Sequence, residues 1–378
     1  MSDPNTIRIL SLDGGGERGY LSLNFLKLFL TQWLGADGPN TNIASKFDVI
    51  TGASIGGIMG LGLANGMTAN SLTPFFTEQG PYIFTEFYTG IPPINPSQRP
   101  SQAEQLAYLT AGTPFYQSSG AYENDYGAGK LVTTMQSTFG SATLANLQTS
   151  VLIPSYQTDT NKFVSFSNRN YPNFIGQNEL ISNVGLATSA APVYLPTWSF
   201  GGHTYNDGGV YLNNPALMGL TLGKMLKPRA NRYCVLSLGT GIGPDQGSYI
   251  RDLSKLNEHS FDNIRNPRID PKIITFLKEF AKNGIGFPIV STLVPIIAEA
   301  GTGSQESVAE TLLLDSLYTL DQLYYYRFQP TFINIPDGED VKLDNTTTTI
   351  LDYYVSTANN WYNNDISNIS TFIGHLTA

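Results

Sequence analysis

The chain has 378 residues, of which 41% are hydrophobic, 12% aromatic and 13% charged, and its formal net charge is −9. This composition excludes a disordered chain, because disordered chains are poor in aromatic residues and rich in charge. The acidic balance disfavours nucleic acid as a partner, since a negative surface repels the phosphate backbone.

The chain contains one cysteine, Cys234, so no intramolecular disulfide forms, and we expect this thiol to be buried in an apolar strand. The N-terminus has no signal-peptide pattern, and no apolar stretch reaches the ~20 residues of a membrane-spanning helix. We therefore expect a cytoplasmic or peripheral membrane protein. Export by a route that does not depend on an N-terminal signal peptide is the alternative.

The N-terminal part predicts alternating strands and helices. Residues 6–12 have the apolar character of a strand, and the apolar period of residues 20–34 predicts a helix. A second strand is predicted over 47–52. A second helix, over 55–65, is expected to end at Gly66, whose lack of a side chain suits the left-handed cap.

Residues 80–130 are rich in proline, glycine, tyrosine and serine, which predicts a long irregular insertion. The alternation of strands and helices resumes after it. We expect strands over 149–156 and 162–168, a helix over 179–196, a short strand ending at Asp207, a helix over 214–226 and a strand over 233–241.

From about residue 250 the pattern changes to longer helices, and no linker-like composition precedes them. These elements are helices over 271–283 and 307–323, a strand-like stretch over 324–335 and a last helix over 349–362. The order of elements indicates an α/β core over residues 5–245. The mainly helical C-terminal part, 246–378, is expected to pack on this core and not to form an independent domain.

Residues 13–19, Asp-Gly-Gly-Gly-Glu-Arg-Gly, join the first strand to the first helix. Such a loop aims backbone N–H groups at an anion, and it also satisfies the G-x-G-x-x-G pattern of dinucleotide-binding proteins. A dinucleotide site needs an acidic residue at the end of a second strand about 20 residues on. Asp37 has that spacing but follows the helix and lies outside any predicted strand, which argues against a dinucleotide site.

Residues 52–56, Gly-Ala-Ser-Ile-Gly, match the G-x-S-x-G pattern between a predicted strand and a predicted helix. In this nucleophile elbow the serine occupies a strained turn, and small residues on either side leave room for the crossing backbones. Ser54 is therefore the candidate nucleophile. The alternative is a tight turn with an inert serine.

A nucleophilic serine needs a base. The histidines are His203, His259 and His375, and none has surroundings typical of a catalytic base. Asp207 ends a short predicted strand and precedes two glycines, where its carboxylate is placed to act as a general base. Taken alone, Asp-Gly-Gly is more typical of a simple turn.

The glycine loop, the elbow and Asp207-Gly208-Gly209, in this order, resemble the signature of patatin-like phospholipases. The resemblance implies a three-layer α/β/α fold with a mainly parallel central sheet and a largely helical C-terminal part. It also implies a Ser54–Asp207 catalytic dyad. The oxyanion hole would come from Gly14, Gly15 and Gly16, and the supporting residues would be Arg18, Gly52, Gly56, Gly208 and Gly209.

The activity implied by this resemblance is hydrolysis of fatty-acyl esters of phospholipids or galactolipids without a metal or cofactor. A membrane lipid would be the substrate, and membrane association would be transient. Segments 81–94 and 284–301 are candidates for a lid or membrane-facing segment, and the alternative for each is a core segment or a packed loop. Two alternatives stay open: a phospholipase effector that needs an activator, and a storage-type patatin with incidental esterase activity. The sequence names no activator and sets no oligomeric state.

Overall fold

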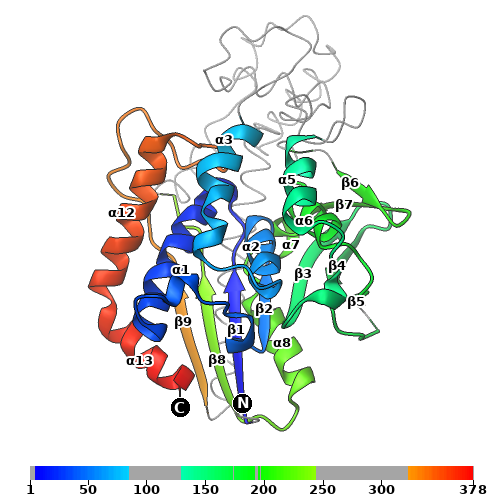
Figure 1. The fold of residues 1–378 in the computed structure, drawn as a ribbon, viewed down its shortest axis with the longest axis horizontal. Coiled ribbons are helices and arrows are strands. Elements are labelled where there is room, and N and C mark those ends of the chain that lie inside the picture. The colour runs from blue at the N-terminus through cyan, green and yellow to red at the C-terminus, as the bar shows by residue number, and fades with distance from the viewer. Residues whose placement is uncertain are drawn as a thin grey trace, which may run out of the picture.

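The computed structural model describes residues 5–84, 129–172, 174–191, 195, 197–243 and 322–377. They form one sheet with helices packed against it (Figure 1). Residues 85–128, within the predicted insertion, lie outside the described part. The same holds for residues 244–321, which include the helix predicted over 271–283 and nearly all of the helix predicted over 307–323.

Five parallel strands form the centre of the sheet, in the order β3-β2-β1-β8-β9. Their bounds are β1 (Thr6–Leu12), β2 (Val49–Gly52), β3 (Ser150–Gln157), β8 (Arg232–Leu238) and β9 (Leu323–Phe328). Strand β1 lies in the middle and is almost entirely buried, as parallel strands covered on both faces are. The predicted α/β class with a mainly parallel sheet is confirmed.

The sheet continues beyond β3 as an antiparallel extension. It consists of β4 (Lys162–Phe166), β5 (Phe174–Ile175), β6 (Trp198–Phe200) and β7 (His203–Asp207). Strands β4 and β7 both pair with β3 in the antiparallel direction, and β6 forms a hairpin with β7. The strand predicted to end at Asp207 is therefore present and joins the main sheet.

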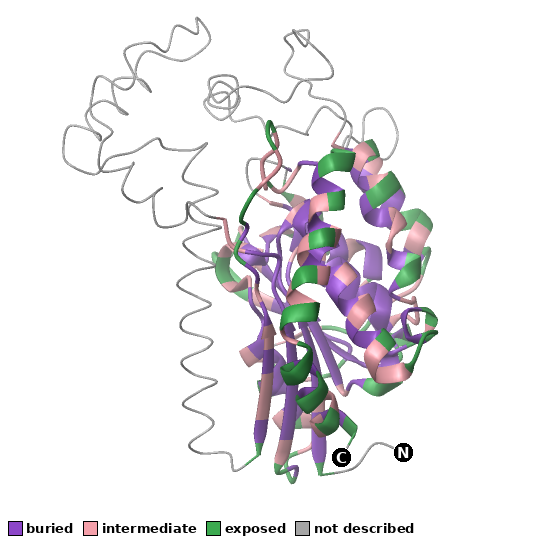
Figure 2. Cartoon of the chain, turned by 90° about the vertical axis from the view of Figure 1, so that its left-hand side faces the viewer, coloured by how far each residue is buried: buried purple, intermediate pink, exposed green. Residues whose placement is uncertain are grey.

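Helices cover both faces of the sheet and give three layers, with buried residues concentrated in the strands (Figure 2). On one face α8 (Ala216–Leu226) packs against Ile7 and Ile9 of β1. The other face, toward which Leu10 and Leu12 point, carries the larger core. Its helices are α1 (Gly19–Leu34), α2 (Ile55–Ala64), α5 (Lys130–Phe139), α6 (Ile181–Ser189), α12 (Thr348–Asn364) and α13 (Ile366–Thr377).

Several boundaries differ from the prediction. The helix expected over 179–196 ends at Ser189, because Pro192 disfavours helical backbone just before it. The short helix α3 (Gly80–Ile83) lies inside the segment predicted to be irregular, 80–130, and α5 begins at its last residue; neither helix was expected. No helix in the described ranges is long and apolar enough to cross a membrane. Cys234 is fully buried in β8, as expected.

A buried ion pair connects the C-terminal strand β9 to the end of β1. Arg327 Nη2 lies 2.6 Å from Asp13 Oδ2, and Arg327 Nη1 lies 3.1 Å from Asp13 Oδ1. The same guanidinium donates to Ser237 Oγ of β8 at 2.9 Å. Asp13 immediately precedes the glycines of the loop. The two parallel bonds between Arg327 and Asp13 therefore fix the position at which the loop leaves the sheet.

We expect Arg327→Met to lower the free energy of unfolding by about 3–5 kcal/mol, because Asp13 would keep a buried charge without its partner. Urea denaturation measures this change. The double variant Asp13→Asn/Arg327→Met should be less destabilised than Arg327→Met, since it removes both charges. A single variant within about 1 kcal/mol of the wild type would contradict the stabilising role of the pair.

Candidate active site

Ser54 occupies the sharp turn between β2 and α2. Its backbone has φ 53° and ψ −127°, a left-handed conformation that costs a non-glycine residue about 1–3 kcal/mol. The turn is tightly enclosed: a Cβ added to Gly52 would overlap the carbonyl of Gly56, and one added to Gly56 would overlap the carbonyl of Leu12. Ser54 therefore has the geometry of a nucleophile elbow.

Two strands bring Ser54 and Asp207 together because they run toward each other along one edge of β3. Strand β2 is parallel to β3, and its Thr51 lies opposite Leu152. Strand β7 is antiparallel to β3 and ends with Asp207 opposite Ser155. The carboxyl ends of β2 and β7 therefore meet over a short stretch of β3.

The Asp207 side chain is 5% exposed, and its carboxyl interacts with the Ser54 side chain. Its Oδ1 also accepts the backbone N–H of Gly209 at 2.6 Å. Burial raises the pKa of Asp207 from 3.8 to about 7, while the interactions with Ser54 and with the Gly209 N–H act in the opposite direction. A carboxyl with a pKa near neutrality is suited to accept and return a proton.

Thr188 of α6 connects the serine turn, β3 and the aspartate turn. Its hydroxyl accepts the backbone N–H of Ser54 at 3.1 Å and donates to the carbonyl of Pro154 at 2.7 Å. Its own carbonyl accepts the N–H of Gly208 at 3.0 Å. One residue thus bonds to the backbone on both sides of the Ser54–Asp207 pair and holds their separation.

The glycine loop lies directly against Ser54. A Cβ added to Gly14 would lie 3.0 Å from Ser54 Cβ. The Gly14 carbonyl accepts hydrogen bonds from Thr240 Oγ1 at 2.7 Å and Asn213 Nδ2 at 3.2 Å, and the Gly14 N–H donates to the Asn213 carbonyl at 3.3 Å. These bonds fix the loop at the distance from the serine that only glycine permits.

The next residues of the loop present backbone donors. Within the described ranges, no acceptor bonds to the N–H of Gly15 or Gly16. Gly16 has φ 54°, a conformation that glycine adopts without strain. Ile55 follows the serine at the first position of α2, where backbone N–H groups lack an acceptor within the helix. An anion bound between Ser54 and the loop would meet these donors.

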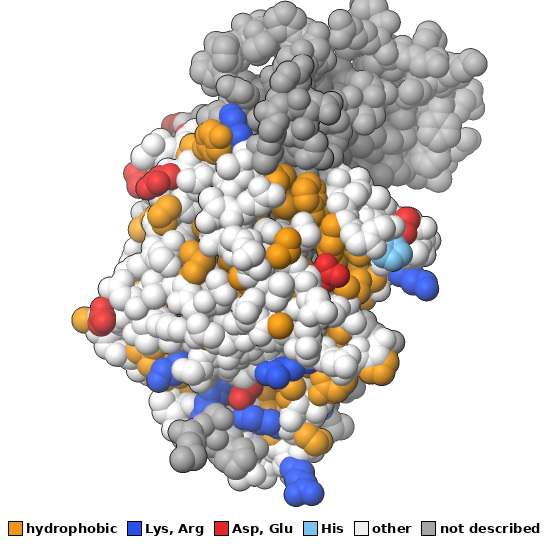
Figure 3. All heavy atoms as spheres, turned by 45° about the vertical axis from the view of Figure 1, so that its right-hand side comes forward, with side chains coloured by type: hydrophobic (Ala, Val, Ile, Leu, Met, Phe, Trp, Pro, Cys, Tyr) orange, Lys and Arg blue, Asp and Glu red, His pale blue; other side chains and the backbone are white. Residues whose placement is uncertain are grey.

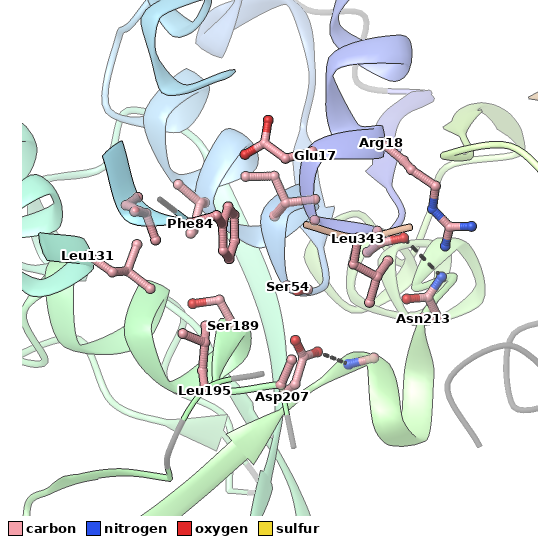
Figure 4. A pocket seen from close by; sticks show the side chains of 18 of the residues that line it. Glu17, Arg18, Ser54, Phe84, Leu131, Ser189, Leu195, Asp207, Asn213 and Leu343 are labelled. Carbon is pink, nitrogen blue, oxygen red and sulfur yellow. Dashed lines mark hydrogen bonds between the residues drawn. The ribbon is translucent and has the colours of Figure 1, made fainter. Parts of the chain in front are cut away.

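One cavity of about 110 Å³ contains these groups (Figure 4). Its polar lining includes the glycine loop, Ser54 and Asp207. Most of its wall is apolar and comes from α2, α5 and the segment just before residue 85. The apolar residues include Ile55, Ile58, Phe75, Ile83, Phe84 and Leu131. Such a wall suits a hydrocarbon chain better than a charged ligand.

The surface shown in Figure 3 agrees with this apolar character. Hydrophobic side chains appear over the whole of that face, while most of its Lys and Arg side chains lie toward the lower end. The lower end is the one at which β1 begins, away from the carboxyl ends of the parallel strands (Figure 1).

The structure brings together most of the residues selected from the sequence. The cavity lining includes Gly14, Gly15, Gly16, Arg18, Ser54, Asp207 and Gly209. The other three, Gly52, Gly56 and Gly208, lie behind it and allow close approach of backbone. The Arg18 side chain is buried, and its backbone N–H donates to the Gly15 carbonyl at 3.1 Å.

The described histidines lie outside the cavity lining. His203 is exposed at the start of β7, with its Nδ1 2.7 Å from Asp159 Oδ2. His375 of α13 stacks on Tyr324, with ring centroids 3.6 Å apart. His259 lies outside the described residues. The described residues contain no group of three or more side chains arranged to hold a metal ion.

The two segments predicted as a lid or membrane-facing surface are described only in part. Segment 81–94 contributes Ile83 and Phe84 to the lining, and its remainder from residue 85 lies outside the described residues. All of segment 284–301 lies outside them as well. The sequence had not singled out Thr188 or Arg327. Thr188 lies within residues 187–196 and Arg327 within residues 325–329, and the sequence of both stretches also resembles the patatin-like family. That resemblance is the signal that would have found them.

Comparison with known proteins agrees with this geometry. A family model described as patatin-like phospholipase matches residues 10–220, more than half of the chain. The chain belongs to the patatin-like phospholipase family. The matched range contains the glycine loop, Ser54 and Asp207, so the residues assembled in the cavity lie within the patatin-like part of the chain.

Patatin-like relatives come from bacteria and plants. A cGAMP-activated phospholipase of Vibrio cholerae serotype O1 is 36% identical over 224 residues, which cover 57% of each protein. Patatin-like protein 1 of Oryza sativa subsp. indica is 29% identical over 275 residues, covering 64% of this chain and 60% of the relative. The chain thus spans about three-fifths of the length of these curated relatives.

Among solved structures, VipD from Legionella pneumophila aligns with 94% of this chain and 67% of its own, with 14% identity and a TM-score of 0.36.

We expect kcat/KM for a soluble ester to rise with pH and to level off above an apparent pKa near 7. The base must be ionised, and because burial raises the pKa of Asp207 to about 7, its active form is lost as the pH falls below that value. The profile is measured from pH 5 to 9 with a p-nitrophenyl ester, corrected for ionisation of the product. A flat profile between pH 5 and 8 would contradict the raised pKa.

We expect Thr188→Val to lower kcat/KM by about 10–100-fold, because valine keeps the shape but bonds neither Ser54 N–H nor the Pro154 carbonyl. Thr188→Ser, which keeps the hydroxyl, should retain activity within a few-fold. Steady-state kinetics, with circular dichroism to verify folding, measures both. Full activity in a folded valine variant would exclude this positioning role.

Proposed function

We propose that this chain is a lipid acyl hydrolase of the phospholipase A type, which cleaves fatty-acyl esters of phospholipids or galactolipids. The observation that carries the proposal is that Ser54, on a strained elbow, and the buried Asp207 lie together in the wall of one largely apolar cavity. In this proposal Ser54 is the nucleophile and Asp207 is the general base.

In the acylation step, Ser54 Oγ attacks the ester carbonyl carbon and its proton passes to the Asp207 carboxylate. The carbonyl π electrons move to the oxygen and form a tetrahedral oxyanion. When this intermediate collapses, the bond to the alcohol oxygen breaks and Asp207 returns the proton to that oxygen. The products are the free alcohol and an acyl-serine ester.

The oxyanion is stabilised by backbone N–H groups of the glycine loop. The N–H groups of Gly15 and Gly16, and the N–H of Ile55 at the start of α2, are proposed as its donors, while the Gly14 N–H bonds to Asn213. A single donor of this kind typically contributes about 10²–10³-fold in rate. The bonds that hold Gly14 keep these donors preorganised.

Deacylation repeats the same steps with water in place of the alcohol. Asp207 accepts a proton from water, the resulting oxygen nucleophile attacks the acyl carbon, and collapse of the intermediate returns the proton to Ser54 Oγ. The fatty acid leaves and the serine is restored. One carboxylate therefore serves as both base and acid in each half of the reaction, the role that histidine has in a triad.

The acyl chain is proposed to occupy the apolar part of the cavity, between α2, α5 and residues 75–84. Near its rim, Tyr82 is 48% exposed and lies under Lys130, whose Nζ is 4.8 Å from the ring centroid. An exposed aromatic ring beside a cation suits the headgroup region of a membrane. We propose transient contact with a lipid surface at this rim.

We expect Ser54→Ala and Asp207→Asn each to lower fatty acid release from mixed-chain phosphatidylcholine vesicles by at least about 10³-fold, because each removes one member of the dyad. Ser189→Ala is the matched control: Ser189 lines the same cavity, but its hydroxyl is bonded to the Gly185 carbonyl at 2.7 Å. Chromatography of the released acids measures the rate and identifies the chain that is cleaved. Full activity in a folded Ser54→Ala variant would overturn the proposal.

A second candidate is a hydrolase that acts on lipid only with an activator, which is favoured by a relative named for activation by cGAMP. The vesicle assay distinguishes the two candidates when it is repeated with cGAMP. A wild type that cleaves a small soluble ester, and cleaves vesicle lipid only after cGAMP is added, would support the second candidate. Equal lipid hydrolysis with and without cGAMP would support an enzyme that does not need this activator.

A further inference from the structure

Glu17 has no part in the proposed mechanism, yet its side chain lines the same cavity as Ser54. It belongs to the 3₁₀ turn η1 (Gly16–Arg18) that follows the glycine loop, and it is only 4% exposed. In Figure 4 its carboxyl group lies at the opposite end of the view from Asp207, with Phe84 between them. It is thus a second carboxyl group in this cavity, in a different environment.

The Glu17 carboxyl has no hydrogen-bond partner in the described part of the chain, and its Oε2 is shielded from solvent. The group lies against Gly80, where an added Cβ would overlap Glu17 Oε1. Burial raises the pKa of Glu17 well above its usual value of 4.5. Burial favours the neutral form of this carboxyl, and in that form it carries an O–H group that is able to donate a hydrogen bond.

An unbonded donor is unfavourable in a cavity that holds only a hydrocarbon chain. Neighbouring residues of the lining, such as Ile55, Phe75 and Ile83, are apolar. A methionine or leucine in place of Glu17 would extend this wall without leaving a buried polar group unsatisfied. The Glu17 carboxyl is therefore suited to bind a ligand that has a hydrogen-bond acceptor oxygen within the apolar part of the cavity.

We propose that Glu17 donates a hydrogen bond to the carbonyl oxygen of a second ester in the substrate, which makes the cavity selective for diacyl over monoacyl lipids. This inference rests on the proposed lipid hydrolase function. Two neighbouring glycerol carbons of a diacyl lipid carry ester groups, so the second ester enters the site with the first. A neutral ester carbonyl fits an apolar cavity better than a phosphate, whose charge is costly to remove from water.

The test measures binding in the Ser54→Ala protein, so that it does not depend on turnover. Titration calorimetry compares dihexanoylphosphatidylcholine with its monoacyl counterpart, and dihexanoylglycerol with monohexanoylglycerol. Adding Glu17→Met should lower the ratio of diacyl to monoacyl affinity about tenfold in both pairs, as expected for loss of one hydrogen bond. Adding Glu17→Gln should keep most of the ratio, because the amide is still a donor.

Glu78→Met is the matched control, since Glu78 is an exposed carboxylate on the neighbouring π-helical turn η5 (Phe75–Gln79) and is absent from the lining. This variant should leave the ratio unchanged. Thermal melting gives a second readout: Glu17→Met should melt at or above the parent temperature, because it removes a buried polar group without a partner. A clear fall in melting temperature would indicate a structural role and overturn the proposal.

An unchanged ratio in both pairs would also overturn the proposal. So would equal losses for both phosphocholine ligands with neither glycerol ligand affected, since the acceptor would then be the phosphate. Fatty acid release is assayed separately with Ser54 in place. A protein that binds with the expected selectivity but releases no acid would overturn the proposed function and leave the role of Glu17 supported.

Discussion

The edge of β3 receives two strands from opposite directions, and the geometry of the cavity depends on this meeting. Two strands cannot pair with the same residues on one edge of β3. Strand β2 therefore pairs with residues 150–152 and β7 with residues 155–157, and each ends near the other. The chain leaves the sheet at both carboxyl ends, and Ser54 and Asp207 lie on the two resulting turns. Thr188 bonds to both turns and to β3 itself, and these bonds fix the distance between the turns that carry Ser54 and Asp207.

Three buried carboxyl groups around the glycine loop have three different environments. Asp13 is paired with Arg327 in a two-pronged ion pair and serves the structure. Asp207 is desolvated but interacts with Ser54 and accepts a hydrogen bond from Gly209 N–H, and the opposing effects give a pKa of about 7. Glu17 is desolvated without such bonds, and burial raises its pKa well above the usual value. Burial alone does not assign a role; the partners of each carboxyl do.

The central strands and the elbow were predictable because their signals are local: apolar runs for the strands, and G-x-S-x-G between a strand and a helix for Ser54. Helix α5 was missed because its β-branched residues are weak helix formers, and its stability comes from packing on α6. Arg327 and Asp13 are 314 residues apart, and no local pattern links them. Asp207 was a candidate base from its position at a strand end, but Asp-Gly-Gly is also a turn pattern, and the family resemblance was needed to pair it with Ser54 as a dyad.

Cys234 is fully buried in β8, between the middle strand and the strand that carries Arg327, and it is the one thiol of the chain. Burial also raises its pKa, so little of the reactive thiolate is present in the folded protein. A thiol reagent therefore reaches it only when the sheet itself opens. The labelling rate of this single native sulfur reports on the integrity of the sheet, independently of any chemistry at Ser54, without an introduced probe.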